Sequence, residues 1–288
     1  MDAVLNIGKP PGMTSFAAVS AVRKLARATR AGHAGTLDPM ADGVLLVLLG
    51  RATRAARYFE ALPKRYRASV RLGVETDTYD TTGRVRAERP VPDLDHAAVR
   101  ALLLEFTGDI MQVPPMFSAL KKDGRPLYEL ARRGIEVDRG PRPVSVHSLE
   151  LVSIDGALLV IDVRCSKGTY IRALAHDIGA RMGCGGAVER LTRLAVGGFT
   201  SELALDLARA DAAAVAARAL DLNTALGFLP ALALDPAQAR AVRHGNQFSA
   251  ASAAGAGEPV RLVHDGTLLA IGMARPGPAI HPDVVFAG

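Results

Sequence analysis

The chain has 288 residues, 49% of them hydrophobic, and a formal net charge of +6. This length and composition allow a sizeable buried core, which excludes a disordered chain and predicts one large domain, alone or with a small one. No apolar run approaches the roughly 20 residues that a membrane span needs, and the N-terminus lacks the basic-then-apolar pattern of a secretion signal. We therefore expect a cytoplasmic protein with no membrane partner.

The positive charge is concentrated in the first quarter of the chain. Residues 1–72 contain 12 Lys or Arg and 4 Asp or Glu, a net charge of +8, whereas the rest contains 23 and 25, a net charge of −2. A cleft of positive sign attracts a polyanion such as RNA or DNA. A solvated basic surface would give the same numbers, so charge alone leaves nucleic-acid binding open.

The sequence shows no pattern for a metal or a nucleotide cofactor. Cys165 and Cys184 form no CxxC pair and have no histidine at ligand spacing, so we expect two buried thiols. A GxGxxG or Walker pattern is also missing. We therefore predict no cofactor and no bound metal.

The first 73 residues predict two short strands, two helices and a longer strand. In chain order these are a strand at 3–7, a turn at 9–15 with a capping residue Thr14 or Ser15, a helix within 16–28, a strand buried on both faces at 43–50, a helix at 52–62 and a strand at 64–73. The last strand alternates strictly, so that Tyr66 faces inward while Arg65 and Arg67 face outward. Its outer face is basic.

The remainder mixes helices with hairpins. In chain order we predict a helix within 95–107, a basic turn-rich excursion at 121–142, a hairpin at Asp155-Gly156, a strand-to-helix passage at 166–183, an alanine-rich helix at 206–221 and a second hairpin at Asp265-Gly266. This order predicts a mixed α/β (α+β) fold with a largely antiparallel sheet. We expect a main domain at 1–229 and a small β-rich module at 230–288.

The stretch GHAGTLDPMADGVL, residues 32–45, places Asp38 on a glycine-punctuated turn ahead of the buried strand. A carboxylate held on a rigid turn at the mouth of a cleft is pre-organised for attack or proton transfer, although a lone Asp before Pro more often caps a turn. Arg172, in GTYIR, could keep this acid ionised. If that segment is extended, Tyr170 points the same way, and the inward ring of Tyr66 suits stacking on a base.

Four motifs in this order resemble one enzyme family. KPPGMTS, GHAGTLDPMADGVL, KRYRASVRLG and CSKGTYIRALAHDIG are together similar to the TruB family, the bacterial tRNA pseudouridine synthases that modify uridine 55 in the T loop. The resemblance covers about residues 5–200 and implies a sheet of the pseudouridine synthase type. Beyond residue 230 the chain weakly resembles the family's small PUA-like C-terminal module.

The resemblance implies roles for three catalytic residues. Asp38 matches the family's catalytic aspartate, which acts as nucleophile or base on the uridine. Tyr66 matches the tyrosine that stacks on the uracil and helps in proton transfer. Arg172 matches the arginine that pairs with the aspartate. No cofactor is implied.

The resemblance also implies substrate contacts. His33 matches the histidine that takes the place of extruded T-loop bases, while Tyr170 and Leu191 match residues that contact the substrate. Lys9 and Pro10 match a KP motif that supports the active site. The implied partner is tRNA, bound through its T arm and T loop, and nothing indicates a protein partner, so we expect a monomer.

Two positions depart from the family pattern and two other functions remain open. Ala34 and Asp42 stand where many members carry a hydroxyl residue. Asp38 and Asp42 could instead form the carboxylate pair of a glycoside hydrolase. Alternatively, a non-catalytic RNA-binding module would need the basic quarter of the chain but not Asp38.

Overall fold

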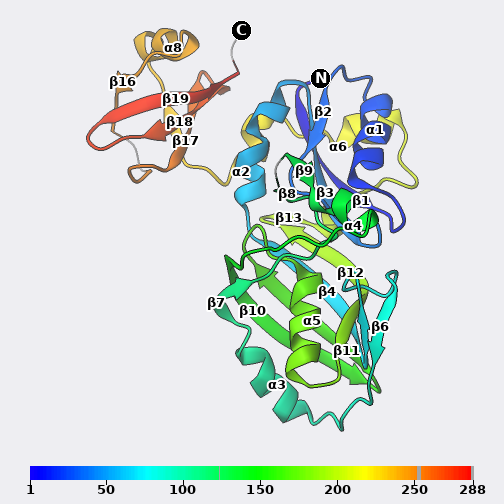
Figure 1. The fold of residues 1–288 in the computed structure, drawn as a ribbon. Helices are drawn as coiled ribbons and strands as arrows, with labels where there is room; N and C mark the ends of the chain where they lie inside the picture. Colours follow the sequence, from blue (N-terminus) through cyan, green and yellow to red (C-terminus); the bar gives the residue numbers. More distant parts are fainter. Residues whose placement is uncertain (123, 252–253, 287–288) are drawn as a thin grey trace.

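The computed structural model describes residues 1–122, 124–251 and 254–286. A ten-stranded sheet forms the body of the molecule, and a five-stranded sheet near the C-terminus lies to one side of it (Figure 1). The main path of the large sheet is β14-β1-β3-β12-β4-β11-β10-β7, and most of its neighbouring strands are antiparallel. The mixed α/β class and the largely antiparallel sheet are therefore confirmed.

The N-terminal elements follow the predicted order. They are β1 (Ala3–Lys9), α1 (Ser15–Leu25), β2 (Ala31–His33), β3 (Asp42–Leu49), a 3-10 helix η1 (Gly50–Ala55), α2 (Ala56–Ala61) and β4 (Lys64–Leu72). Thr14 caps α1 by accepting a hydrogen bond from the amide of Ala17. Residues 44–49 of β3 are all buried, as expected for a strand covered on both faces. The helix predicted at 52–62 is split into η1 and α2.

The second half of the large sheet includes a long strand at 186–196 that we did not predict. Its elements are β7 (Gly108–Gln112), β10 (Arg142–Asp155), β11 (Leu158–Cys165), α5 (Ile171–Arg181), β12 (Gly186–Val196), β13 (Phe199–Thr200) and β14 (Leu205–Asp206), with α3 (His96–Leu104) packed nearby. β12 pairs antiparallel with β4 along its length and parallel with β3 at Thr192 and Arg193. It thereby joins the N-terminal strands to the rest of the sheet.

The alanine-rich helix predicted at 206–221 is much shorter in the structure. Only α6 (Ala212–Arg218) is helical there, followed by α7 (Leu222–Ala225). The carboxylates of Asp206 and Asp211 accept hydrogen bonds from the amides of Ala208 and Ala214. Such local bonds favour turns and N-caps over a continuous helix, so the alanine content alone was misleading.

The excursion at 121–142 contains a small hairpin and a single helix. The hairpin is β8 (Lys121–Lys122) with β9 (Arg125–Pro126), and the helix is α4 (Leu127–Arg132). Gly134, at φ +71°, follows the helix as predicted. Residue 123 of this excursion lies outside the described residues.

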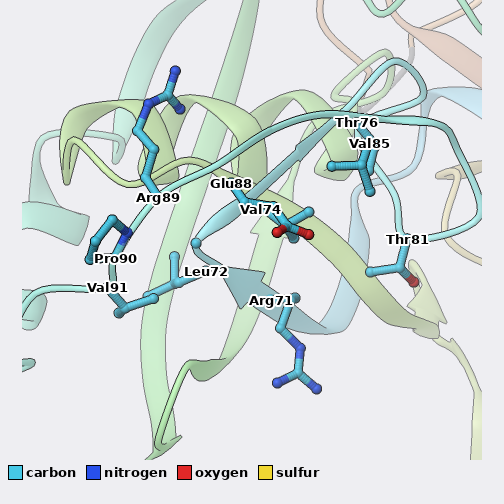
Figure 2. Close-up of a pocket in the computed structure, with 11 residues that line it drawn as sticks. Arg71, Leu72, Val74, Thr76, Thr81, Val85, Glu88, Arg89, Pro90 and Val91 are labelled. Carbon is cyan, nitrogen blue, oxygen red and sulfur yellow. The ribbon is translucent and has the colours of Figure 1, made fainter.

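A second hairpin, β5 (Val74–Thr76) with β6 (Val85–Glu88), follows the end of β4. It borders an open hollow of about 650 Å³ (Figure 2). Two of the charged side chains there are already paired, Arg71 with Glu189 and Arg89 with Glu75. No set of polar groups converges on this hollow, so we do not assign it chemistry.

The C-terminal residues form a β-rich unit, as expected. It comprises β15 (Ala231–Ala233), α8 (Pro236–Arg243), β16 (Phe248–Ser249), β17 (Pro259–His264), β18 (Thr267–Ala274) and β19 (Ala279–Val285), in the sheet order β15-β17-β18-β19-β16. Ile271 and Phe286 share a core cluster with Phe59 of α2. The unit is therefore packed against the main body through apolar contacts.

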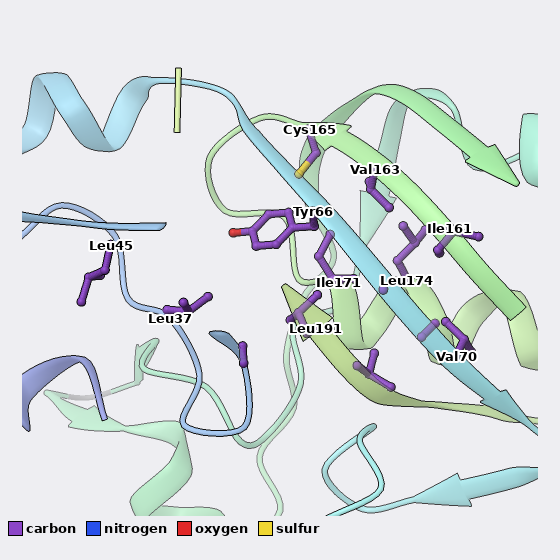
Figure 3. Packing of buried hydrophobic residues seen from close by; sticks show 14 of the residues in the cluster. Leu37, Leu45, Tyr66, Val70, Ile161, Val163, Cys165, Ile171, Leu174 and Leu191 are labelled. Atoms are coloured by element: carbon purple, nitrogen blue, oxygen red, sulfur yellow. The ribbon is translucent and has the colours of Figure 1, made fainter. Parts of the chain in front are cut away.

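The largest hydrophobic cluster holds the inner face of β4 against α5 and β3. Figure 3 shows the ring of Tyr66 extending from β4 toward the segment of Leu37, with Ile171 and Leu191 close by. No described helix is long and apolar enough to cross a membrane. The core thus reaches the loop that carries Asp38.

We predict that Gly43→Ala destabilises the fold because β3 and β12 approach closely at this residue. Gly43 has φ +101°, and an added Cβ would lie 2.3 Å from the carbonyl oxygen of Arg193. We expect a loss of about 3 kcal/mol in the free energy of unfolding, measured by urea denaturation. Gly134→Ala is the control, because Gly134 also has a positive φ but an open surrounding, and should cost only about 1 kcal/mol. Equal losses would contradict this explanation.

Candidate active site

Asp38 forms an ion pair with a deeply buried arginine. The Nε of Arg172 donates to Oδ2 of Asp38 at 2.8 Å, and the side chain of Arg172 is only 5% exposed whereas that of Asp38 is 34% exposed. Leu37, the residue before Asp38, is fixed by Ser15, the first residue of α1. The hydroxyl of Ser15 donates to the carbonyl oxygen of Leu37 and accepts from its amide, each at 2.9 Å. The acid therefore stands at a defined place, half open to solvent.

Arg172 is held by three further groups. Its Nη1 donates to the carbonyl oxygen of Thr78 and its Nη2 to that of Phe117, each at 2.8 Å. Nη1 also lies 3.5 Å from Oδ2 of Asp80, whose side chain is 6% exposed. A buried guanidinium with all its directions satisfied has little freedom to turn, so it fixes the carboxylate of Asp38.

The extended conformation that we considered for the segment around Arg172 is wrong. Tyr170 is the N-cap residue of α5, and Arg172 lies in the first turn of that helix. The side chain of Gln112 on β7 fixes the start of the helix. Its Nε2 donates to the carbonyl oxygen of Tyr170, and its Oε1 accepts from the amide of Tyr170. Tyr170 and Arg172 nevertheless line the same cavity.

A second buried arginine supports the loop that carries Asp38. Arg193 of β12 is 1% exposed and donates to the carbonyl oxygens of Val44 at 2.7 Å, Thr36 at 3.2 Å and Gly35 at 3.1 Å. It thus holds both arms of the loop. We did not single out this residue from the sequence, because its role depends on the pairing of β12 with the distant strand β3.

The KP motif supports the same loop from the other side. Nζ of Lys9 donates to the carbonyl oxygens of Pro10 at 2.9 Å and Met13 at 2.8 Å, and lies 3.5 Å from that of Pro39. Burial lowers the pKa of Lys9 to about 8. Lys9 and Pro10 thus lie behind the turn and not in the cavity beside it.

A cavity of about 500 Å³ opens beside Asp38. Its lining includes Asp38, Tyr66, Tyr170, Arg172 and Leu191, five residues that the sequence analysis selected from four separate segments. It also includes Lys64, Arg193, Thr36, Ser118, Lys167 and Thr169. The lining also holds the exposed residue Glu60. The cavity therefore combines two carboxylates, of which only Asp38 is paired with Arg172, with two phenols and several cations.

The two phenols in this cavity stay protonated at neutral pH. Burial raises the pKa of Tyr66 and of Tyr170, although the guanidinium of Arg193 acts in the opposite direction on Tyr66. Burial, together with the charge of Arg193, lowers the pKa of Lys64 to about 8. The cavity therefore combines two neutral phenols with a lysine whose charge is disfavoured by burial.

His33 and Asp42, like Lys9 and Pro10, lie outside this cavity lining. His33 is half-buried on β2, its Nδ1 has no hydrogen-bond partner, and burial followed by the charge of Arg193 lowers its pKa. Asp42 begins β3 and lies 3.6 Å from the guanidinium of Arg190. Asp42 is therefore not a second carboxylate facing Asp38 across the cavity.

Comparison with protein families matches two consecutive parts of the chain. Residues 23–171 match the TruB family pseudouridylate synthase N-terminal domain, and residues 172–227 match the tRNA pseudouridylate synthase B C-terminal domain. Together they span the elements that form the cavity.

Two relatives and two solved structures illustrate the similarity. The chain is 45% identical to the tRNA pseudouridine synthase B of Aromatoleum aromaticum, over 94% of this chain and 88% of the relative, and 43% identical to that of Geobacter sulfurreducens, over 94% and 93%. A chain in the crystal structure of a Cbf5-Nop10-Gar1 complex is 26% identical with a TM-score of 0.77, covering 99% of this chain and 84% of that one. A chain in an H/ACA RNP bound to a substrate RNA containing 2′-deoxyuridine, 24% identical with a TM-score of 0.75 over 99% and 85%, shares the fold. On the matched domains and the identity over nearly the whole length, this chain belongs to the TruB family of pseudouridylate synthases.

Proposed function

We propose that the cavity at Asp38 receives uridine 55 of the tRNA T loop, and that Asp38, Arg172 and Tyr66 catalyse its isomerisation. As a TruB family enzyme the chain is a tRNA pseudouridine synthase, so the reaction is known and the roles of the individual residues are what we add. The observation that carries the proposal is the bond from Arg172 to Asp38, because it presents one ionised carboxylate to the cavity.

The reaction balances without another reactant. The bond from N1 of the base to C1′ of the sugar breaks, the base turns, and a bond forms between C5 and C1′. The proton on C5 leaves and N1 gains one, so no atom is added and no electron is transferred. The chain's own acid, phenols and cations supply the groups that these steps require.

Asp38 has one oxygen engaged and one available. Oδ2 accepts the bond from Arg172, whereas no hydrogen bond from the described residues reaches Oδ1. The available oxygen serves equally for attack on C1′, attack on the ring, or removal of a proton from the sugar. Each role needs a carboxylate held in place, and the bond from Arg172 supplies that hold.

Tyr66, Tyr170 and Leu191 surround the place where the base would lie. The buried ring of Tyr66 offers a stacking surface, and its hydroxyl is suited to a proton exchange at C5. Extrusion of the nucleotide from its stack costs a few kcal/mol, which contacts inside the cavity offset. His33, on the neighbouring strand β2, is the residue we propose to fill the space left in the T loop.

The glycoside hydrolase alternative relied on Asp42 as the second carboxylate. Asp42 pairs with Arg190 and does not line the cavity, and Asp80 is buried against Arg172. A hydrolase pair would need two carboxylates facing one glycosidic bond. The Asp38–Asp42 pair that this alternative requires is therefore not formed, and the isomerase proposal needs only Asp38.

The same proposal includes the finer points of domain, partner and location. We propose a catalytic domain at 1–229 and a PUA-like module at 230–288, since the strands of the small sheet all lie within 231–285.

We also propose that the enzyme acts in the cytoplasm as a monomer on the T arm, with the excursion at 121–142 holding the RNA backbone. Six of the seven cations in that excursion are exposed, and only Arg139 is partly buried.

We predict that Asp38→Asn abolishes pseudouridine formation and leaves tRNA binding nearly intact, because the amide keeps the shape of the side chain but loses the charge. The measurement is incubation with unmodified tRNA, nucleoside analysis of the product, and a separate binding assay. The RNA mass should be unchanged by the wild-type enzyme, whereas release of free uracil would support a hydrolase. Full turnover by the variant would contradict the assigned role.

We predict that Asp80→Asn lowers kcat about tenfold, equivalent to about 1.4 kcal/mol, because Arg172 loses one of the charges that hold it. Asp42→Asn is the matched control: it removes a carboxylate on the nearby strand β3 that does not line the cavity, and should leave kcat within about twofold. Single-turnover rates with saturating enzyme separate the two. An equal effect of both substitutions would show that general electrostatics, not the hold on Arg172, is responsible.

We predict that neutralising the excursion flattens the salt dependence of tRNA binding, because each lost phosphate contact removes released counterions. The positions to change to Gln are Lys121, Lys122, Arg125, Arg132, Arg133, Arg139 and Arg142. The measurement is the dissociation constant at several KCl concentrations. An unaltered slope would count against an RNA contact by this excursion.

A further inference from the structure

Most cations of the basic N-terminal quarter are already engaged within the protein. Lys9 and Lys64 are buried and donate to backbone carbonyls. Arg65 and Arg67 both pair with Asp162, so the outer face of β4 is largely neutralised by its neighbour β11. Arg71 pairs with Glu189. This outer face is thus a poor candidate for holding a polyanion.

A further three arginines join the main body to the C-terminal unit. Arg51 and Arg54 donate to the carbonyl oxygens of Phe286 and Val285, and Arg57 pairs with Asp283. These three residues, spaced three apart on η1 and α2, are committed to an internal contact. The net charge of +8 over residues 1–72 therefore overstates the number of cations available to a ligand.

Four cations remain, and they lie within eight residues of one another. Arg23 and Lys24 occupy the last turn of α1, and Arg27 and Arg30 follow in the connection to β2. All four are exposed, and no ion pair or side-chain hydrogen bond joins any of them to another described residue. We call these four residues the α1 end patch.

The α1 end patch lies at a distance from the cavity that a nucleic-acid stem can bridge. Helix α1 begins at Ser15, which is bonded to Leu37 beside Asp38, and it rises about 14 Å from there to Lys24. At its other end the carbonyl oxygen of Arg30 accepts a hydrogen bond from the amide of Gly50, the first residue of η1. The patch thus extends from the end of α1 to the start of β2, beside η1.

The backbone at Arg27 allows this cation to be removed without disturbing the fold. Arg27 has φ +48°, in the left-handed region where glycine is favoured, directly after the C-cap residue of α1. Its exposed side chain has no partner within the described residues. Arg27→Gly therefore removes the charge while the backbone keeps its conformation.

We propose that the α1 end patch binds the phosphate backbone of the tRNA T-arm stem while the T loop occupies the cavity. This inference rests on the proposed function and adds the surface that orients the substrate. Arginine and lysine bind phosphates without reading sequence, so the patch sets the register of the stem and not the choice of base. An RNA duplex is favoured over a single strand because the four cations extend away from the cavity along α1 and the connection after it.

The test compares a variant with all four patch residues changed to Gln with the wild-type enzyme, using two RNA probes. One probe is a T-arm hairpin with its full stem, and the other is a single-stranded RNA with only the T-loop sequence. For the hairpin we expect at least a tenfold weaker dissociation constant at low salt and a salt slope reduced by about 3 to 4, from four contacts of roughly 0.7 to 0.9 each. For the loop probe we expect less than a twofold change.

Two further variants keep the test decisive. Arg84→Gln with Arg100→Gln removes two exposed, unpaired cations elsewhere and should change neither probe's binding. Arg27→Gly should weaken hairpin binding without lowering the melting temperature, because glycine accepts the left-handed conformation.

Unchanged hairpin affinity and salt slope in the four-residue variant would overturn the inference, and so would an equal loss for both probes. Failure of the proposed function has a different signature, because the wild-type enzyme would then bind the hairpin without forming pseudouridine in it. The two failures are therefore distinguishable in one set of measurements.

Discussion

The buried guanidinium of Arg172 is the constraint on which the site depends. A cation that is 5% exposed needs acceptors in several directions, and here they come from the Asp38 turn, the loop of Thr78 and Asp80, and the segment at Phe117. Removing one partner of such a pair leaves an uncompensated buried charge, which is strongly destabilising. The cavity therefore forms only when these three segments and α5 come together.

The Asp38 turn is held by buried cations on either side. Arg193 donates hydrogen bonds to the carbonyl oxygens of Gly35, Thr36 and Val44. Lys9 donates to those of Pro10 and Met13. Neither cation donates a hydrogen bond to a carboxylate of the described residues, so both act mainly through backbone oxygens. This arrangement leaves the side chain of Asp38 open to the cavity while its backbone stays fixed, which is the pre-organisation that catalysis by this carboxylate requires.

The sequence predicted those site residues whose positions follow from short sequence motifs or from the alternation along one strand. Alternation along β4 placed Tyr66 inside, and the motifs around Asp38 and Arg172 predicted that these residues lie together, as they do. β12, Arg193 and Asp80 escaped prediction because their importance comes from pairing between distant segments. The same limit explains the helix predicted at 206–221, where local Asp-to-backbone bonds outweighed alanine content.

The most direct test of the central claim is a crystal structure of the Asp38→Asn enzyme bound to an unmodified T-arm hairpin. We predict a flipped uridine in the cavity, stacked on Tyr66, with its glycosidic bond intact and the residue 38 side chain facing the sugar and base. A uridine bound elsewhere, or a base that leaves Tyr66 and Arg172 uncontacted, would contradict the account.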